Sequence, residues 1–258
     1  MNRLLSWACL GFVCVLPTWC HAAGLVRSEN FIVSGPNDET AQAVLNRAEE
    51  LRRDIAIRWL GEELPPSVGP TIIHVEISDT EDSNLTWVID DPRRNYHSIW
   101  LKTTTERATG GALGHELTHS ILATRYPDQV PVWATEGIAC QQDDNARKTK
   151  RHRIIEWYGK TGNWPSLEKF FSKKHLPADD QAGYATAESV VTYLLAKGDQ
   201  TKLLSFVTKS NKVGLPQALR EDYGFTSIDN FENAWREWVQ SSKAVTLTKA
   251  SAESFRGQ

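Results

Sequence analysis

Cysteine is scarce in this sequence, and most of it lies near the N-terminus. Cys9, Cys14 and Cys20 fall within residues 1–22, so Cys140 is the only cysteine in the remainder. If that first segment is removed on export, an internal disulfide is excluded. The chain is therefore not a small scaffold held together by disulfides, and it has to be stabilised by its hydrophobic core or by a bound metal.

An excess of positive charge and long hydrophobic runs are also missing from most of the chain. A net charge of −3 over 258 residues gives no reason to expect nucleic-acid binding. The one extended apolar run, from Leu4 to Pro17, follows Arg3 and leads to small residues at Ala22 and Ala23. This pattern is typical of a secretory signal peptide. We therefore expect residues 1–22 to be cleaved off after Ala22, leaving a periplasmic or secreted protein with no stable membrane span.

The composition is that of an ordinary globular protein, with 40% hydrophobic and 24% charged residues. Sequence patterns predict strands at residues 30–33, 71–77, 85–89 and 98–101, and a helix over 38–60 that is capped by Asn37 or Asp38. Helical character then dominates, at about 108–125, 133–158, 166–173, 183–197, 200–208, 214–222 and 227–240. We expect an α+β fold in one domain over 23–240. A small mixed sheet and the helix bearing the candidate site would occupy 24–125, an all-helical part 126–240, and a flexible tail 241–258.

Candidate functional residues are concentrated in the segment Gly114–His119, which reads GHELTH. On a helix, residues four apart share one face, so His115 and His119 can bind the same metal ion. Glu116 is turned by about 100° from His115 around the helix axis. This rotation places its carboxylate beside the ion rather than on it, where the carboxylate can take a proton from a water molecule.

The downstream sequence offers Glu136 as a third ligand. Metzincins place a Gly three residues, and a His six residues, after the second motif His; here those positions hold Leu122 and Arg125, so that class is excluded. Glu136 lies 17 residues after His119, far enough for a turn and an antiparallel second helix. Two His and one Glu leave a fourth coordination position for water, as in catalytic zinc sites, whereas structural zinc sites are closed and usually contain Cys. This N/O ligand set favours Zn²⁺.

With these residues in place, the sequence resembles the peptidase MA-like, or gluzincin, zinc metallopeptidases. Short members of that group pair a His-Glu-x-x-His helix with a Pro-x-Trp-x-x-Glu-Gly-x-Ala segment, which here is Pro131–Ala139. The similarity covers residues 108–240, about half of the chain, whereas residues 24–102 agree only in their expected strand content. It continues through Tyr184–Ser189, Tyr193–Leu194, Gly198, Ala218–Leu219, Tyr223–Thr226, Trp235 and Trp238.

The resemblance implies a zincin-like fold and hydrolysis of peptide bonds in a peptide or protein substrate. It implies Zn²⁺ as the cofactor, with His115, His119 and Glu136 as its ligands and Glu116 as the general base. A donor to the tetrahedral oxyanion is also required, and the group commonly uses a Tyr or a His. Tyr184 is the first candidate and Tyr193 the second, although interhelical packing explains either tyrosine equally well.

Two departures from the better-known relatives bear on the function. Many gluzincins orient a ligating His with an Asp one turn after the ligating Glu. Here Cys140 takes that position and Asp143 follows a further turn along, so the substitution is an open question. No Gly-Ala-Met-Glu-Asn-type motif precedes the helix, which favours an endopeptidase over an aminopeptidase.

Several other features are expected to be structural. Cys140 is more easily explained as a small buried hydrophobe than as a ligand, and the basic run Arg147–Arg153 as a solvated helix face. The strand around Ser98–Leu101 is a candidate edge for pairing with an extended peptide. Surface or structural roles are expected for the four remaining histidines considered, which are His74, His97, His152 and His175.

Three functions fit these observations. The first is an exported zinc metalloprotease. The second is a non-catalytic zinc protein that holds a peptide or a partner in its cleft, and the third is a hydrolase of peptidoglycan cross-links. Glu116 favours an enzyme, because metal binding alone needs no carboxylate at that position. The sequence gives no indication of the oligomeric state.

Overall fold

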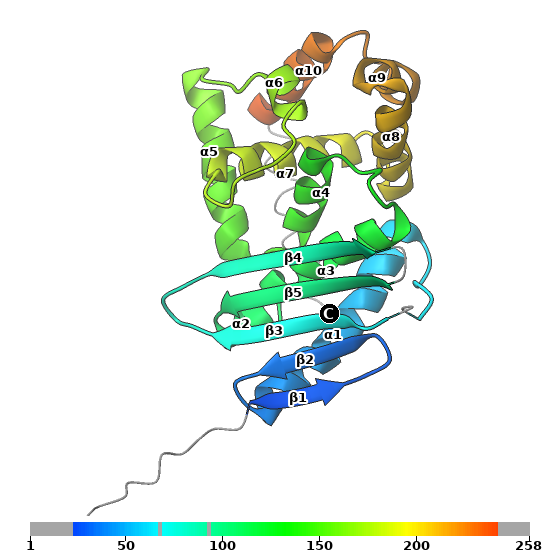
Figure 1. Cartoon of the computed structure of the whole chain (residues 1–258). Coiled ribbons are helices and arrows are strands. Elements are labelled where there is room, and N and C mark those ends of the chain that lie inside the picture. Colours follow the sequence, from blue (N-terminus) through cyan, green and yellow to red (C-terminus); the bar gives the residue numbers. More distant parts are fainter. Residues whose placement is uncertain (1–22, 67–68, 92–93, 242–258) are drawn as a thin grey trace, which may run out of the picture.

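The computed structural model describes residues 23–66, 69–91 and 94–241, and within them the expected α+β architecture is confirmed (Figure 1). A mixed five-stranded sheet and a covering helix come first, and the chain from residue 105 onward is largely helical. The predicted signal peptide, and all but the first residue of the predicted tail, lie outside the described residues. None of the described helices combines the length and apolar character needed to cross a bilayer.

The sheet is mixed and has the order β1-β2-β3-β5-β4. β2, β3 and β5 are parallel to one another, while β1 and β4 run antiparallel to their neighbours. Each predicted strand is present, and of the strands in the structure only the short β1 was not predicted. The strands are β1 (Gly24–Arg27), β2 (Phe31–Gly35), β3 (Thr71–Ile77), β4 (Ser83–Asp91) and β5 (Arg94–Thr103).

β4 is the edge of the sheet that borders the helical half of the molecule (Figure 1). The expectation that Ser98–Leu101 would offer a free edge is wrong, because those residues pair with β3 on one side and with β4 on the other. β4 follows β3 in sequence but does not pair with it; β5 inserts between the two. The unpaired backbone groups of this side of the sheet therefore belong to β4.

Two helices cover one face of the sheet, α1 (Asp38–Leu60) and α3 (Gly111–Arg125). Of the two candidate caps of α1, the structure selects Asn37, whose side chain accepts a hydrogen bond from the backbone N–H of Thr40 at 2.8 Å. The apolar stripe of α1 is buried as its periodicity predicts, with Val44, Leu51, Ile55 and Trp59 among its core residues. Full burial of each such side chain stabilises the fold by roughly 1.5–3 kcal/mol.

Except for the short α2 (Thr105–Ala108), which contacts α3, β3 and β5, the remaining helices form a second layer above β4 (Figure 1). The helices of this layer are α4 (Val132–Ala139), α5 (Asn145–Thr161), α6 (Leu167–Phe171), α7 (Gln181–Leu195), α8 (Gln200–Val213), α9 (Leu215–Tyr223) and α10 (Ile228–Gln240). The predicted helix 108–125 corresponds to α3, which begins slightly later, at Gly111, and the predicted helix 133–158 is divided between α4 and α5.

The break between α4 and α5 has a local cause. A 3₁₀ turn over Cys140–Gln142 ends α4, and Asp143 then adopts an extended backbone conformation. The side chain of Asp144 caps α5 by accepting a hydrogen bond from the backbone N–H of Arg147 at 2.9 Å. Asp favours caps over helix interiors because its side chain competes for backbone N–H groups. The two aspartates thus turn the chain at the place where Asp143 reaches the candidate site.

Candidate metal centre

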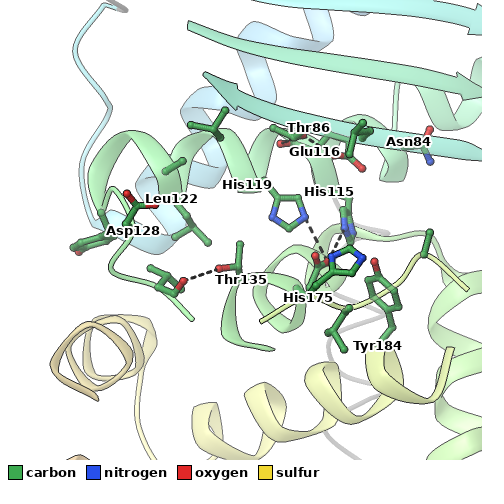
Figure 2. Close-up of a pocket in the computed structure, with 18 residues that line it drawn as sticks. Asn84, Thr86, His115, Glu116, His119, Leu122, Asp128, Thr135, His175 and Tyr184 are labelled. Atoms are coloured by element: carbon green, nitrogen blue, oxygen red, sulfur yellow. Dashed lines mark hydrogen bonds and ion pairs between the residues drawn. The ribbon is translucent and has the colours of Figure 1, made fainter. Parts of the chain in front are cut away.

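Helix α3 presents the three motif residues that the sequence singled out. His115 and His119 project from it toward the helical half, and Glu116 projects toward β4 (Figure 2), while Leu113 and Leu117 are buried in the core. The ring centroids of His115 and His119 are 5.0 Å apart. The four-residue spacing therefore brings two imidazoles to one point, as the helical period requires.

Glu136 reaches the same point from the middle of α4. Its Oε2 lies 3.5 Å from His115 Nε2 and 3.5 Å from His119 Nε2. Trp133, one turn before it, holds α4 in the helical core by packing on Phe171 and Phe206. The three ligand atoms all lie within 4.8 Å of one another, so the group can hold a metal ion.

In the described part of the chain, the side chains of His115, His119 and Glu136 leave one buried oxygen without a partner, and a metal ion would satisfy it. Glu136 Oε2 is buried and has no hydrogen-bond partner among the described residues, a costly arrangement for a carboxylate oxygen. Burial alone would raise the pKa of Glu136, but the His119 and His115 imidazoles beside it hold that pKa well below its usual range. An ionised, unpartnered oxygen facing two imidazole nitrogens is the donor set of a borderline divalent cation such as Zn²⁺.

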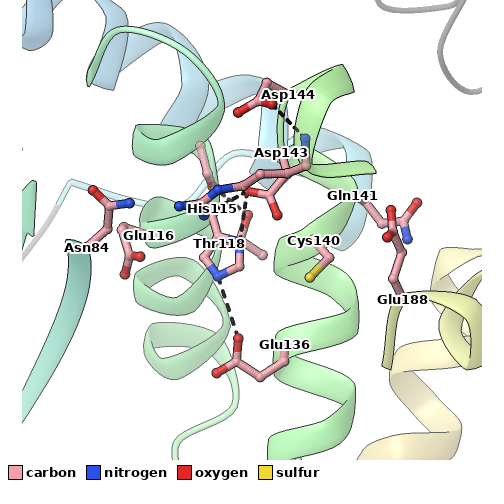
Figure 3. A network of polar contacts seen from close by, with 12 residues as sticks. Asn84, His115, Glu116, Thr118, Glu136, Cys140, Gln141, Asp143, Asp144 and Glu188 are labelled. Atoms are coloured by element: carbon pink, nitrogen blue, oxygen red, sulfur yellow. Dashed lines mark hydrogen bonds and ion pairs between the residues drawn. The ribbon is translucent and has the colours of Figure 1, made fainter. Parts of the chain in front are cut away.

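Asp143 supports His115 from behind, which answers the question that the sequence left open. Its Oδ1 lies 3.2 Å from His115 Nδ1, the ring nitrogen that points away from Glu136 (Figure 3). Burial opposes a charge on His115, but the Asp143 and Glu136 carboxylates outweigh it and raise the pKa of His115 to about 10 in the metal-free protein. A carboxylate behind a ligating His fixes the ring orientation and makes the other nitrogen a better ligand.

Arg151 in turn fixes Asp143. Its Nη1 lies 2.8 Å from Asp143 Oδ2, and its Nε donates to Glu188 Oε2 at 2.5 Å. Burial would raise the pKa of Asp143, but His115 and Arg151 hold it well below the usual range. The expectation that Arg147–Arg153 forms a solvated face is therefore wrong for Arg151, which is only 4% exposed, since two buried carboxylates compensate its charge.

Cys140 is buried beside this network, and its thiol lies close enough to His115 and Asp143 to count as a ligand group. Burial raises the pKa of the thiol well above its usual value. A neutral thiol is a poor ligand, because metals bind the thiolate. The structure therefore agrees with the expectation that Cys140 acts as a small buried hydrophobe.

The carboxylate of Glu116 lies beside the three ligand atoms and contacts β4. Thr86 on this edge strand donates its hydroxyl to Glu116 Oε2 at 2.6 Å and is also 3.0 Å from the Glu116 carbonyl oxygen (Figure 2). Thr86 thereby holds one carboxylate oxygen of Glu116 and does not contact the other, Oε1. No sequence pattern indicates this contact of Thr86, because it depends on the position of β4 at the edge of the sheet.

The two tyrosines considered as oxyanion donors lie in different places. Tyr184, in the first turn of α7, lines the cavity together with His115 and Glu116. Burial and the nearby Glu136 carboxylate raise its pKa, so its hydroxyl keeps its proton and can donate a hydrogen bond. Tyr193 is 2% exposed and packs against Phe225, Phe231 and Trp238. Tyr184 is thus the tyrosine that faces the site.

Two adjoining cavities, together called the cleft, run along β4 past these residues. They share five lining residues, Asn84, His115, Glu116, Ala178 and Tyr184. One cavity, of about 390 Å³, extends to the C-terminal end of α3 and is called the apolar arm; Val88, Leu122, Ala123, Tyr126 and Val130 line it. The other, of about 420 Å³, extends to α5 and is called the basic arm; Arg147, Lys150, Arg151 and Gln181 line it with Asp82 and Ser83.

The four other histidines among the described residues have the surface or structural positions expected from the sequence, and one of them also lies at the cleft. His97 is buried and pairs with Ser120 Oγ at 2.6 Å, His74 stacks on Trp100, and His152 lies 3.2 Å from Glu156 on α5. His175 is exposed as expected, but it also lines the apolar arm (Figure 2). Its position follows from the α6–α7 connection folding over the cleft, which no local sequence pattern indicates.

Helices α4 and α7 carry Glu136 and Tyr184, and Gly137 allows them to approach closely. A Cβ at position 137 would lie 2.4 Å from the Ala187 carbonyl oxygen and 2.5 Å from Val191 Cγ2. We expect Gly137→Ala to lower the free energy of unfolding by about 1–3 kcal/mol, because backbone has to move. Gly159→Ala is the matched control: the nearest atom to its Cβ is 3.8 Å away, and a helical alanine should stabilise by about 0.5–1 kcal/mol. Urea unfolding of both variants tests this, and equal stabilities would contradict it.

Comparison with protein-family models and with curated proteins found no match to this chain.

Proposed function

We propose that this protein is a zinc-dependent endopeptidase in which Glu116 is the general base. The observation that carries the proposal is the convergence of His115, His119 and Glu136 on one point. The carboxylate of Glu116 lies beside this ligand group and is not part of it. A purely structural metal site needs no such carboxylate and leaves no cavity in front of the ligands. Both features are those of a catalytic site.

Zinc bound by His115, His119 and Glu136 would supply Lewis acidity, polarising a carbonyl group and lowering the pKa of water to about 7. Glu116 takes the proton of the attacking water on Oε1, the oxygen that Thr86 does not hold, and returns it to the nitrogen of the leaving amine. Tyr184 donates its hydroxyl hydrogen bond to the oxyanion that develops on the scissile carbonyl. Asp143 keeps the His115 ring in the orientation that its ligand role requires.

The edge strand β4 supports a peptide as the substrate. Its unpaired backbone groups run along the cleft from Ser83 to Val88 and can pair with an extended chain. The cleft continues on both sides of Glu116, so a chain has room before and after the scissile bond. This two-sided cleft supports cleavage within a chain over removal of a terminal residue.

Metal removal tests the proposal. The chain treated with a chelator should lose hydrolysis of an unbiased peptide library, and one equivalent of Zn²⁺ should restore it, because the three ligands alone have no Lewis acidity. Cleavage products read by mass spectrometry give the activity, and elemental analysis gives the metal content. A zinc-loaded chain that cleaves neither library peptides nor peptidoglycan cross-links would refute the enzyme and leave a metal protein that binds a peptide or partner.

A further inference from the structure

The basic side chains that the structure describes in the cleft lie at one end of it. Among the described residues that line the apolar arm, none is Lys or Arg, and the fixed charge near its far end is Asp128. Within the described part of the chain, the lysines and arginines that line the cleft are Arg147, Lys150 and Arg151, and all three lie in the basic arm on a single helix, α5. A ligand with a carboxylate at one end would therefore enter the cleft in one direction only.

The three cations differ in how far other residues neutralise them. Arg151 is bound to Asp143 and Glu188, and Arg147 Nη2 donates to Asp82 Oδ2 at 2.5 Å. Lys150 is exposed and has no ion-pair partner among the described residues. Its ammonium is the cation of the basic arm that is free to bind an anion from solution.

The direction of β4 relates the basic arm to the polarity of a bound peptide. Ser83, the first residue of β4, and Asp82 just before it line the basic arm, and Val88, farther along the strand, lines the apolar arm. Antiparallel pairing is slightly more stable per residue than parallel pairing. A peptide added antiparallel to β4 has its N-terminal side in the apolar arm and its C-terminal side in the basic arm.

We propose that the basic arm is a binding subsite for a carboxylate on the C-terminal side of the scissile bond, with Lys150 as its principal cation. An acidic side chain and the C-terminal carboxylate of a short substrate share this chemistry. The subsite favours peptides with an apolar residue before the cleaved bond and a negative charge after it. This inference rests on the proposed peptidase function and names its substrate class.

The test measures binding separately from cleavage. The zinc-loaded Glu116→Gln chain is titrated, at low ionic strength, against fluorescent peptides with a central Leu, followed at successive positions by Glu or by Gln. Each peptide is made with a free and with an amidated C-terminus, which distinguishes a side-chain carboxylate from a terminal one. We expect the carboxylate to tighten Kd about two- to fivefold through one largely exposed ion pair. The preference should fall in high salt.

Lys150 is tested by charge reversal and by neutralisation. Lys150→Glu should reverse the preference for Glu over Gln, and Lys150→Met should abolish it. Arg153→Glu is the matched control, because Arg153 is exposed on the same helix and lines neither arm; it should keep the preference. All three variants are compared by fluorescence anisotropy after circular dichroism has established that each is folded.

The outcomes separate this inference from the proposed function. Peptides that bind with no carboxylate preference, or with one that Lys150→Glu leaves intact, overturn the subsite. If the carboxylate preference depends on Lys150 but the zinc-loaded wild-type chain hydrolyses no peptide, the subsite is supported and the peptidase function is refuted. If no peptide binds to the Glu116→Gln chain or to the wild-type chain, both proposals are refuted.

Discussion

Replacing Glu116 by glutamine should lower kcat/KM for peptide hydrolysis by about 10²–10⁴-fold while leaving the metal in place. The amide keeps the shape of the side chain and can still contact Thr86, but it cannot accept the proton of the attacking water. His115, His119 and Glu136 are untouched, so zinc content should stay at one equivalent. The loss should appear in kcat rather than in KM, since substrate contacts along β4 are unchanged.

Single-turnover kinetics and elemental analysis on the same preparations check this prediction. Glu168→Gln, a substitution on the exposed side of α6 outside the cleft, is the control for a change of one charge and should retain full activity. If Glu116→Gln kept most of its activity, the general base would have to be another group. If it lost zinc, Glu116 would act as a ligand and not as a base.

The parts of this molecule that follow a short-range rule could be predicted from the sequence. The 3.6-residue period places His115 and His119 on one face, and it also marks the buried stripe of α1 from Val44 to Trp59. The β-branched run Thr71–Ile77 is a strand with the predicted bounds. Each of these features depends on residues within one helix or strand, so the local sequence is sufficient to predict it.

The parts that depend on how elements meet could not be predicted in the same way. Thr86 contacts Glu116 because β5 pairs between β3 and β4 and leaves β4 at the edge. Asp143 reaches His115 because the chain breaks between α4 and α5, and the alternation of polar residues there also fits one long helix. The buried pair of Arg151 and Glu188 joins positions 37 residues apart. Periodicity carries no information on such contacts, since they are settled by packing.

Removing the charge of Asp143 should weaken zinc binding by about 10–100-fold, the second largest effect that we expect. Asp143→Asn keeps the size of the side chain beside His115 Nδ1, but the neutral amide no longer polarises the ring or stabilises its charge on zinc. The affinity of the metal-free protein for zinc, measured by competition with a chelator of known affinity, gives the result directly. At saturating zinc, Asp143→Asn should regain most of the peptidase activity of the wild type, because the three ligands themselves remain.

Glu188→Gln separates this role from a general loss of stability. Asp143 and Glu188 are both carboxylates bound to the buried Arg151, but only Asp143 also contacts His115. Each substitution leaves Arg151 with one carboxylate fewer, so both variants should lose about 1–3 kcal/mol of unfolding free energy. Only Asp143→Asn should reduce zinc affinity, because only Asp143 touches a ligand. Equal losses of affinity in the two variants would mean that the network acts through the stability of the fold, and that Asp143 does not orient His115.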